Sequence, residues 1–286
     1  MRFTSCLLSA STLVFVPSGY ADAQNAGKNM ALDFRTTIVV QGTADTGVIT
    51  GHAVGSSEKM RLDVKMKGAG AQISPLASDS TVSMIVSDSG KTITYLNSSK
   101  SQYLRVRPAE MIAQAQQMGG MKMDFSGTVA KVDSLGAGPT ILGHPTSHYR
   151  VATGMTMTIS AMGQAQTVQI ASTTDTYFAT DIKGDLNPFQ SLSSGDMASM
   201  FGSTNKDFAD KIKAVQQKLP KGTPLRALGT ASMVTEGRTK VTNSVAEVTA
   251  IQWVASDPKV FEVPPAYTPV QLPGMGGPSG GAIPPQ

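Results

Sequence analysis

The segment from Lys59 to Lys67 constrains the fold of this chain more than any other segment. Its even-numbered positions are all apolar and its odd-numbered positions are all charged. A period of two is typical of a β-strand that buries one face and exposes the other to water. We therefore predict a strand here, whose buried face carries Met60, Leu62, Val64 and Met66.

Further short runs of β-branched and aromatic residues surround this strand. Residues 32–40 and 48–54 precede it, and residues 82–86, 92–96 and 103–106 follow it, with polar turn residues such as those at 97–100 between the runs. Turn residues between such runs predict an antiparallel meander. Because a sheet with one apolar face must bury that face, we expect another element to cover it.

Longer β-rich segments follow in the second half of the chain. Residues 125–132, 147–160, 167–180, 225–235 and 239–254 predict five more strands, several of them longer than the usual five or six residues. Within 147–160, apolar side chains alternate with polar or small ones, which predicts one inward face formed by Tyr149, Val151, Met155, Met157 and Ile159.

Three segments predict helices placed between the strands, near 108–118, 188–201 and 206–219. Pro108 suits the first turn of the first helix. In the third, four apolar residues recur at intervals of four, three and four, which is a helical stripe: Phe208, Ile212, Val215 and Leu219. These helices are candidates for the cover of the sheet.

The N-terminal residues predict a signal peptide over 1–23. Arg2 precedes an apolar run at 6–16, and Ala21 and Ala23 form a small-x-small cleavage site. Cleavage would remove Cys6, the only cysteine, so we expect a periplasmic mature chain without disulfide or thiol chemistry. The apolar run is shorter than the roughly 18 to 20 residues of a spanning helix, so we expect no membrane span.

The C-terminal residues from Pro264 onward are rich in proline and glycine and lack charge. This composition predicts a disordered tail over 264–286. The remaining residues, 24–263, have the length of a single domain with a substantial core.

Charge and motif content exclude several classes of function. The net charge is +4, but the basic residues are scattered and not interleaved with aromatic ones, so we expect no nucleic-acid partner. No nucleophile elbow, phosphate loop or carboxylate pair is present, so we expect neither catalysis nor a cofactor. His144 and His148 are four residues apart, but Pro145 between them opposes the helix that a metal site would need.

Methionines gather in two places, near 118–123 and near 155–162. Thioethers are soft ligands that suit cuprous ion, so a copper-handling protein that uses Met121, Met123, Met155 and Met157 is an alternative. Methionine is also an adaptable core residue, and the alternation around Met155 and Met157 favours packing or the lining of an apolar pocket.

Six fragments that span most of the mature chain carry a resemblance, and they lie at 58–63, 101–103, 143–151, 175–181, 222–225 and 260–267. They resemble an uncharacterised bacterial family of exported proteins, domain of unknown function 4412, which is related in pattern to periplasmic lipoprotein carriers of the Lol (LolA and LolB) type. Two positions depart from the family, which often has cysteine where Thr146 stands and tryptophan where Phe178 stands.

The resemblance implies a mainly β fold with α insertions, in which a curved antiparallel sheet, a half-barrel, is covered by amphipathic helices. It also implies an apolar ligand, such as a lipid or a lipoprotein acyl chain, and a transient envelope protein as partner. We hypothesise a non-catalytic periplasmic carrier. The alternatives are copper handling and a structural domain with a filled core. The expected ligand-binding residues are Met60, Leu62, Val64, Met66, Tyr149, Val151, Met155, Met157, Ile159, Phe208, Ile212 and Val215.

Overall fold

The computed structural model describes residues 27–43, 46–56, 59–68, 81–108, 110, 121–161, 164–182 and 206–270. The predicted signal peptide and the predicted helix near 188–201 lie outside these residues, as does almost all of the predicted helix near 108–118. The predicted helix near 206–219 is present as α4, Lys206–Lys218.

Twelve strands of the described residues form one sheet, in the order β12-β6-β5-β4-β3-β2-β1-β11-β10-β9-β8-β7. All neighbours pair antiparallel except β12, which lies parallel to β6. The strands are β1 (Lys28–Val40), β2 (Thr46–Gly55), β3 (Met60–Lys67), β4 (Thr81–Ser87), β5 (Thr92–Asn97), β6 (Gln102–Val106), β7 (Met121–Ala137), β8 (Thr146–Ala161), β9 (Gln164–Ala179), β10 (Thr223–Thr235), β11 (Arg238–Ala255) and β12 (Thr268–Pro269).

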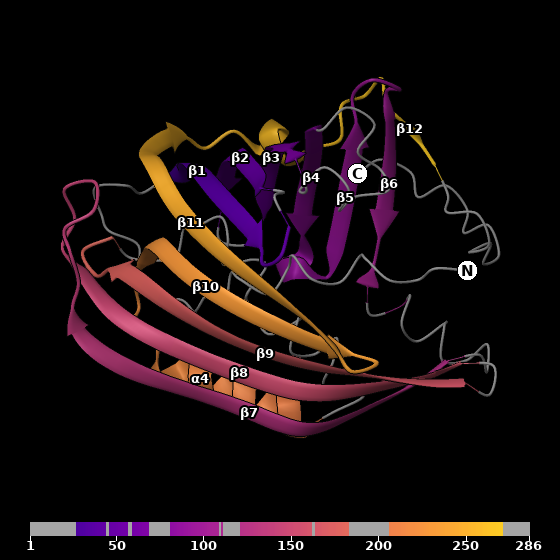
Figure 1. The fold of residues 1–286 in the computed structure, drawn as a ribbon. Coiled ribbons are helices and arrows are strands. Elements are labelled where there is room, and N and C mark those ends of the chain that lie inside the picture. The colour runs from indigo at the N-terminus through magenta and orange to yellow at the C-terminus, as the bar shows by residue number, and fades with distance from the viewer. Residues whose placement is uncertain are drawn as a thin grey trace.

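The sheet consists of two meanders that meet along one strand pair. Strands β1 to β6 follow each other in sequence, β7 to β11 do the same, and β1 pairs with β11 over almost its whole length. The end strands β12 and β7 do not pair with each other, so the sheet stays open while it curves (Figure 1). This confirms the predicted mainly β fold with an open, curved antiparallel sheet.

Local turn chemistry explains how the chain reverses between strands. Between β10 and β11, Glu236 and Gly237 both have positive φ, which is the geometry of a two-residue turn that matches the twist of a hairpin. Between β5 and β6, the side chain of Asn97 accepts a hydrogen bond from the backbone N–H of Lys100 at 3.1 Å.

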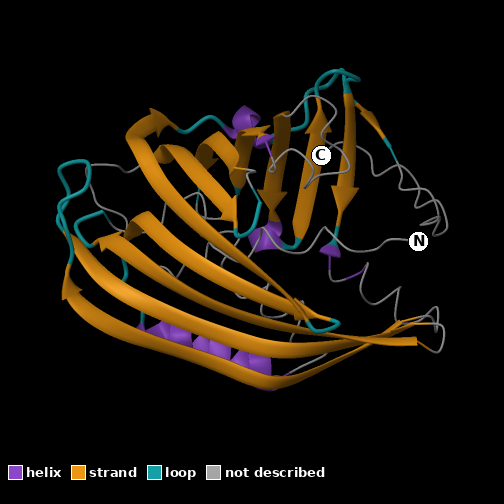
Figure 2. Ribbon diagram, in the orientation of Figure 1, coloured by secondary structure: helices purple, strands orange, loops and turns teal. Residues whose placement is uncertain are grey.

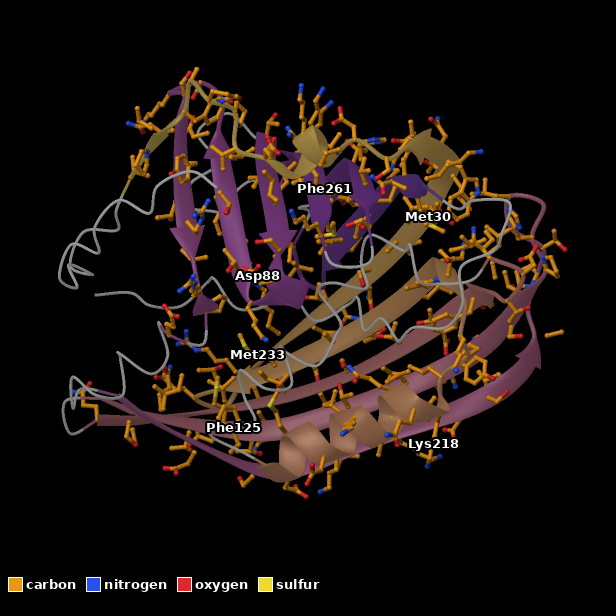
Figure 3. All side chains as sticks on the ribbon, turned by 180° about the vertical axis from the view of Figure 1, so that it is seen from behind. Met30, Asp88, Phe125, Lys218, Met233 and Phe261 are labelled. Carbon is orange, nitrogen blue, oxygen red and sulfur yellow. The ribbon has the colours of Figure 1, made fainter. Side chains whose placement is uncertain are left out.

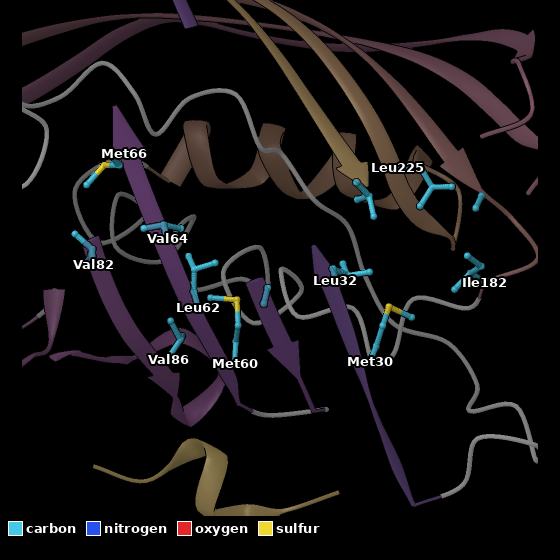
Figure 4. Packing of buried hydrophobic residues seen from close by; sticks show 13 residues of the cluster. Met30, Leu32, Met60, Leu62, Val64, Met66, Val82, Val86, Ile182 and Leu225 are labelled. Atoms are coloured by element: carbon cyan, nitrogen blue, oxygen red, sulfur yellow. The ribbon is translucent and has the colours of Figure 1, made fainter. Parts of the chain in front are cut away.

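The inner face of the first meander forms the largest apolar cluster. The register places Leu32, Ala53 and Leu62 in one row across β1, β2 and β3, all pointing to this face. Figure 4 shows the side chains of this cluster gathered with Leu225 and Ile182, which the second meander contributes. The buried face predicted for the segment from Lys59 to Lys67 is confirmed.

The outer face of the first meander is also covered, which the one-sided pattern of β3 did not predict. A strap of residues 256–270 includes the short helix η5 (Pro258–Phe261) and ends in β12. Its Phe261 and Tyr267 join an apolar cluster with Ile85 and Leu96 on this face. The backbone N–H groups of Thr268 and Val270 donate to the carbonyls of Ser101 and Tyr103.

The predicted start of the disordered tail at Pro264 is therefore wrong. Thr268 and Pro269 pair with β6, because the half-buried ring of Tyr267 packs on the outer cluster and the backbone of β12 satisfies the open edge of the sheet. Composition alone missed this segment, since a strand only two residues long has no period to detect.

Replacing Gly51 by Ala should destabilise the fold. Gly51 faces Phe34 and Val64, and an added Cβ would lie 2.4 Å from Phe34 Cζ and 2.9 Å from Val64 Cγ1. Overpacking of this kind costs about 1–3 kcal/mol. Urea unfolding measures the loss. Gly154→Ala is the control, because its Cβ would meet nothing closer than 3.6 Å; an equal loss for both variants would contradict the prediction.

Candidate functional site

The inner, concave face of the sheet is the candidate site, because it carries all the predicted binding residues that lie on strands, and α4 with its own predicted residues packs on the same face. Met60, Leu62, Val64 and Met66 alternate along β3, and all four are buried in the cluster of the first meander. These four residues form a packed part of the concave face and leave little surface there for a ligand.

Helix α4 lies on the concave face of the second meander (Figure 2). Its Val215, and Leu219 directly after its last residue, are buried against Val151 and Phe178 of the sheet. Tyr149 meets Phe178 edge to face, with ring centroids 6.0 Å apart. The apolar stripe predicted for this helix therefore docks where the sequence predicted, on the inner face of the long strands.

A polar contact fixes the other half of α4 to the edge strand β7. The ammonium group of Lys211 donates to the carbonyl oxygen of Thr128 and to a carboxylate oxygen of Asp207, both at 2.9 Å. In Figure 3, Phe125 of β7 lies near one end of α4 and Lys218 near the other. The helix thus runs along β7, and its two ends contact different parts of the concave face.

The concave face continues past α4 toward the far ends of the long strands. Met155, Ile170 and Met233 share one row across β8, β9 and β10, and all three are half-buried. In the next row, Phe125 and Val168 flank the buried Met157. We call this apolar surface, together with the half-buried Ile159, the distal rows.

The predicted binding residues thus divide into three groups. Those of β3 belong to the first meander, while Tyr149, Val151 and Val215 pack between sheet and helix. Met155, Met157 and Ile159 belong to the distal rows. Ile212 is half-buried, and the side chain of Phe208 lies outside the described residues.

Sequence reasoning left several contributors out of the site, among them Phe178, Leu219, Ile170 and Met233. Leu219 belonged to the predicted stripe but was not named as a binding residue. The other three were detectable only in part, since the alternation in β9 and β10 is weakened by threonine, alanine and glycine at inward positions.

The arrangement of the methionines favours packing over metal ligation. Met155 and Met233 share a row but are separated by Ile170 on the strand between them. Two strand spacings place their backbones about 9.6 Å apart. The side chains of Met121 and Met123 lie outside the described residues.

A polar cluster lies on the opposite, outer face of the second meander. The guanidinium group of Arg150 donates two hydrogen bonds to the Asp175 carboxylate, at 2.7 and 2.8 Å. The ring of His148 stacks on Tyr177 with centroids 4.4 Å apart, and its Nε2 lies 3.5 Å from Asp175 Oδ1. The Arg150 hydrogen bond is the largest of the influences that hold the pKa of Asp175 below its ordinary value.

The other two histidines also pair with aspartates: His52 with Asp33 at 2.7 Å and His144 with Asp181 at 2.8 Å. No group of three or more metal-binding side chains from His, Cys, Asp and Glu is close enough to hold a metal ion within the described part of the chain. These contacts join neighbouring strands and loops, and no nucleophilic side chain lies within hydrogen-bond distance of the histidines there.

A surface hollow of about 300 Å³ lies at the tips of the long strands, away from α4. Its walls come from the start of β9, the end of β10 and the turn after β10, and the residues that line it are Ala165, Gln166, Thr167, Gln169, Val234, Glu236 and Gly237. It contains none of the predicted binding residues.

Comparisons with known proteins give no family for this chain. No protein-family model matches it, and no curated protein matches it. Among the described residues, no helix has both the length and the apolar character that crossing a membrane requires.

Replacing Leu219 by Ala should detach the C-terminal end of α4. The residue is buried against the sheet, and truncation of a buried leucine costs about 2–5 kcal/mol. Urea unfolding gives the free energy, and hydrogen exchange should show faster exchange confined to α4. The exposed Lys213→Ala is the matched control on the same helix. Unchanged exchange in Leu219→Ala would refute the docking.

The Asp175 carboxylate should make stability depend on pH in the acid range. Its folded pKa lies below the ordinary 3.8, so ionised Asp175 stabilises the fold at neutral pH. This contribution should disappear as the pH falls from the ordinary pKa of 3.8 through the lowered pKa that Asp175 has in the folded protein. Asp175→Asn should show a shallower loss of unfolding free energy in that range, measured in urea. The exposed Asp210→Asn should retain the wild-type slope.

Proposed function

We propose that this protein is an exported, non-catalytic carrier that shelters an apolar ligand between its concave sheet and α4. The ligand class is a lipid or a lipoprotein acyl chain, held in the periplasm. One observation carries the proposal: the apolar concave face extends past α4, and Met155, Ile159, Ile170 and Met233 there are only half-buried.

The energetics of burial support this ligand class. Each methylene group removed from water contributes about 0.8 kcal/mol, so a few methylenes on the distal rows would give measurable affinity. Methionine suits such a surface because its flexible thioether adapts to chains of different shape. The open edges of the sheet at β7 and β12 leave room for a ligand to enter without opening a closed barrel.

The sequence adds two supports of its own. The predicted signal peptide directs the chain to the envelope, where acylated molecules must cross water between membranes. The resemblance to domain of unknown function 4412 and to Lol-type carriers supports the same function. We propose that the chain belongs to that family as well as that it acts as a carrier. The competing proposal is a structural domain whose concave face is filled by the chain itself.

Ligand binding is tested on protein purified from the periplasm. Native mass spectrometry, followed by organic extraction, should find bound lipid, and lipid should displace a fluorescent fatty-acid probe added to the delipidated protein. Protein that carries no lipid and takes up no probe would instead support the filled structural domain.

The distal rows should determine probe affinity. Met155→Gln places an amide on the half-buried concave surface and should weaken probe binding roughly tenfold, the loss expected when about 1.4 kcal/mol of apolar contact is removed. Val129→Gln is the control, since Val129 is 58% exposed on the outer side of β7. Circular dichroism melting confirms that both variants fold. Equal affinity in the two variants would place the probe elsewhere.

A further inference from the structure

Strand β7 forms one open edge of the sheet. It stands last in the strand order of the described residues, with β8 as its one neighbour. Two bulges interrupt it, between Ser126 and Val129 and between Ser134 and Gly136, and residues 129–134 between them pair regularly with β8. The edge of a strand carries a row of backbone N–H and C=O groups that can pair with a further strand. This regular stretch is therefore a candidate surface for another chain.

The side chains that this stretch exposes follow a simple order. Val132 packs in the cluster under α4, so its neighbours Lys131 and Asp133 point to the outer face, where they form an ion pair at 2.9 Å. Val129 before them is 58% exposed, and Leu135 after them is 44% exposed. Along the edge, the exposed chemistry thus reads apolar, cation, anion, apolar.

This order is complementary to itself when it runs in the opposite direction. An antiparallel copy of β7, with the partner's Val132 opposite Val132, places the partner's Asp133 opposite Lys131. The same register places the partner's Leu135 opposite Val129. Residues directly opposite each other on antiparallel strands have Cβ atoms about 4.5–5.5 Å apart, within reach of ion pairing and apolar contact. Two-fold symmetry then repeats each contact on the other side of the centre.

The charges behind the edge favour the same partner. Asp175 of β9, Arg150 of β8 and Asp133 of β7 lie opposite one another in a single row, so the sign of the charge alternates toward the edge. Arg150 donates to the Asp175 carboxylate at 2.7 and 2.8 Å. In the antiparallel register, the partner's Lys131 is the next residue of this row. The alternation of charge therefore continues into the second copy.

Other registers of the same strand pair are unfavourable. A shift of two residues places either the partner's Lys131 opposite Lys131 or the partner's Asp133 opposite Asp133, and like charges directly opposite each other are destabilising. A shift of one residue would set the outer face of one strand against the concave face of the other. The side chains thus select one antiparallel register, centred on Val132.

Helix α4 leaves this edge accessible. Its Val215 is buried against Val151 of β8 and Phe178 of β9, so the helix lies over the sheet and not beyond its edge (Figure 1). The ammonium group of Lys211 occupies the carbonyl oxygen of Thr128, which belongs to the bulge before the regular stretch. The helix therefore contacts the edge strand without occupying the backbone of residues 129–134 through this hydrogen bond.

We propose that the protein forms a two-fold homodimer in which β7 pairs antiparallel with β7 of a second copy. The pairing joins two twelve-stranded sheets edge to edge and sets their concave faces side by side. It does not cover residues 121–126, which border the distal rows. A single strand contact buries less than the roughly 1,200 Å² of a standard stable interface, so the dimer is weak, with a Kd on the order of micromolar or higher.

Sedimentation velocity tests the dimer on protein purified from the periplasm, at concentrations up to about 1 mM. Wild type should dimerise as its concentration rises, and added salt should weaken the dimer. Lys131→Asp and Asp133→Lys each place like charges opposite one another, so each variant alone should dimerise at least tenfold more weakly. Lys240→Asp is the matched control, because it makes the same charge change at an exposed position on β11.

A mixture of Lys131→Asp with Asp133→Lys should restore dimers. In the mixed pair, two carboxylates on one strand lie opposite two ammonium groups on the other, which neither variant achieves with itself. The double variant, which carries both changes, exchanges the two charges and should dimerise as wild type does. It also replaces a single variant that fails to fold, since circular dichroism melting is recorded for each protein.

Three results would each overturn the proposal. The first is a wild type that stays monomeric over the whole concentration range. The second is a folded Lys131→Asp variant that dimerises as strongly as wild type, since the contact would then lie elsewhere. The third is a mixture of the folded single variants, or a folded double variant, that dimerises no better than a single variant alone.

Discussion

The pairing of β1 with β11 is the interaction on which the rest of the structure depends. It runs from Lys28 opposite Ala255 to Val40 opposite Thr242, with one irregularity at Asp33 and Phe34. Since each meander is formed by neighbours in sequence, this long-range pair alone joins them into one sheet and one concave face. Bringing together segments near the two ends of the chain has a high entropic cost, which the shared core around Leu32 and Val248 offsets.

The two halves of the sheet cover their inner and outer faces in different ways. The first meander buries its inner face in the largest core and its outer face under the strap of residues 256–270. The second meander covers part of its inner face with α4, while its outer face carries paired charges such as Arg150 with Asp175. The distal rows lie in the half that α4 covers, so we place the candidate site there.

Prediction from the sequence succeeded where a single strand or helix carries its own periodic signal. The alternation in β3 and β8 and the stripe of α4 identified the residues that face inward. The strap was missed, because the buried Phe261 and the half-buried Tyr267 lose contact with water only by packing on distant strands. Which strands become neighbours has no local signature in the sequence. The sequence therefore could not show which predicted binding residues lie in the packed part of the site and which lie in the open part.

The sequence by itself determined the period of each strand and helix, and hence which side chains share a face. The tertiary structure decided which faces meet. Only the register across β8, β9 and β10 assembles Met155, Ile170 and Met233 into one row. The physical reason is that side-chain direction follows from local backbone geometry, whereas strand pairing depends on the burial and hydrogen bonding gained by the whole sheet.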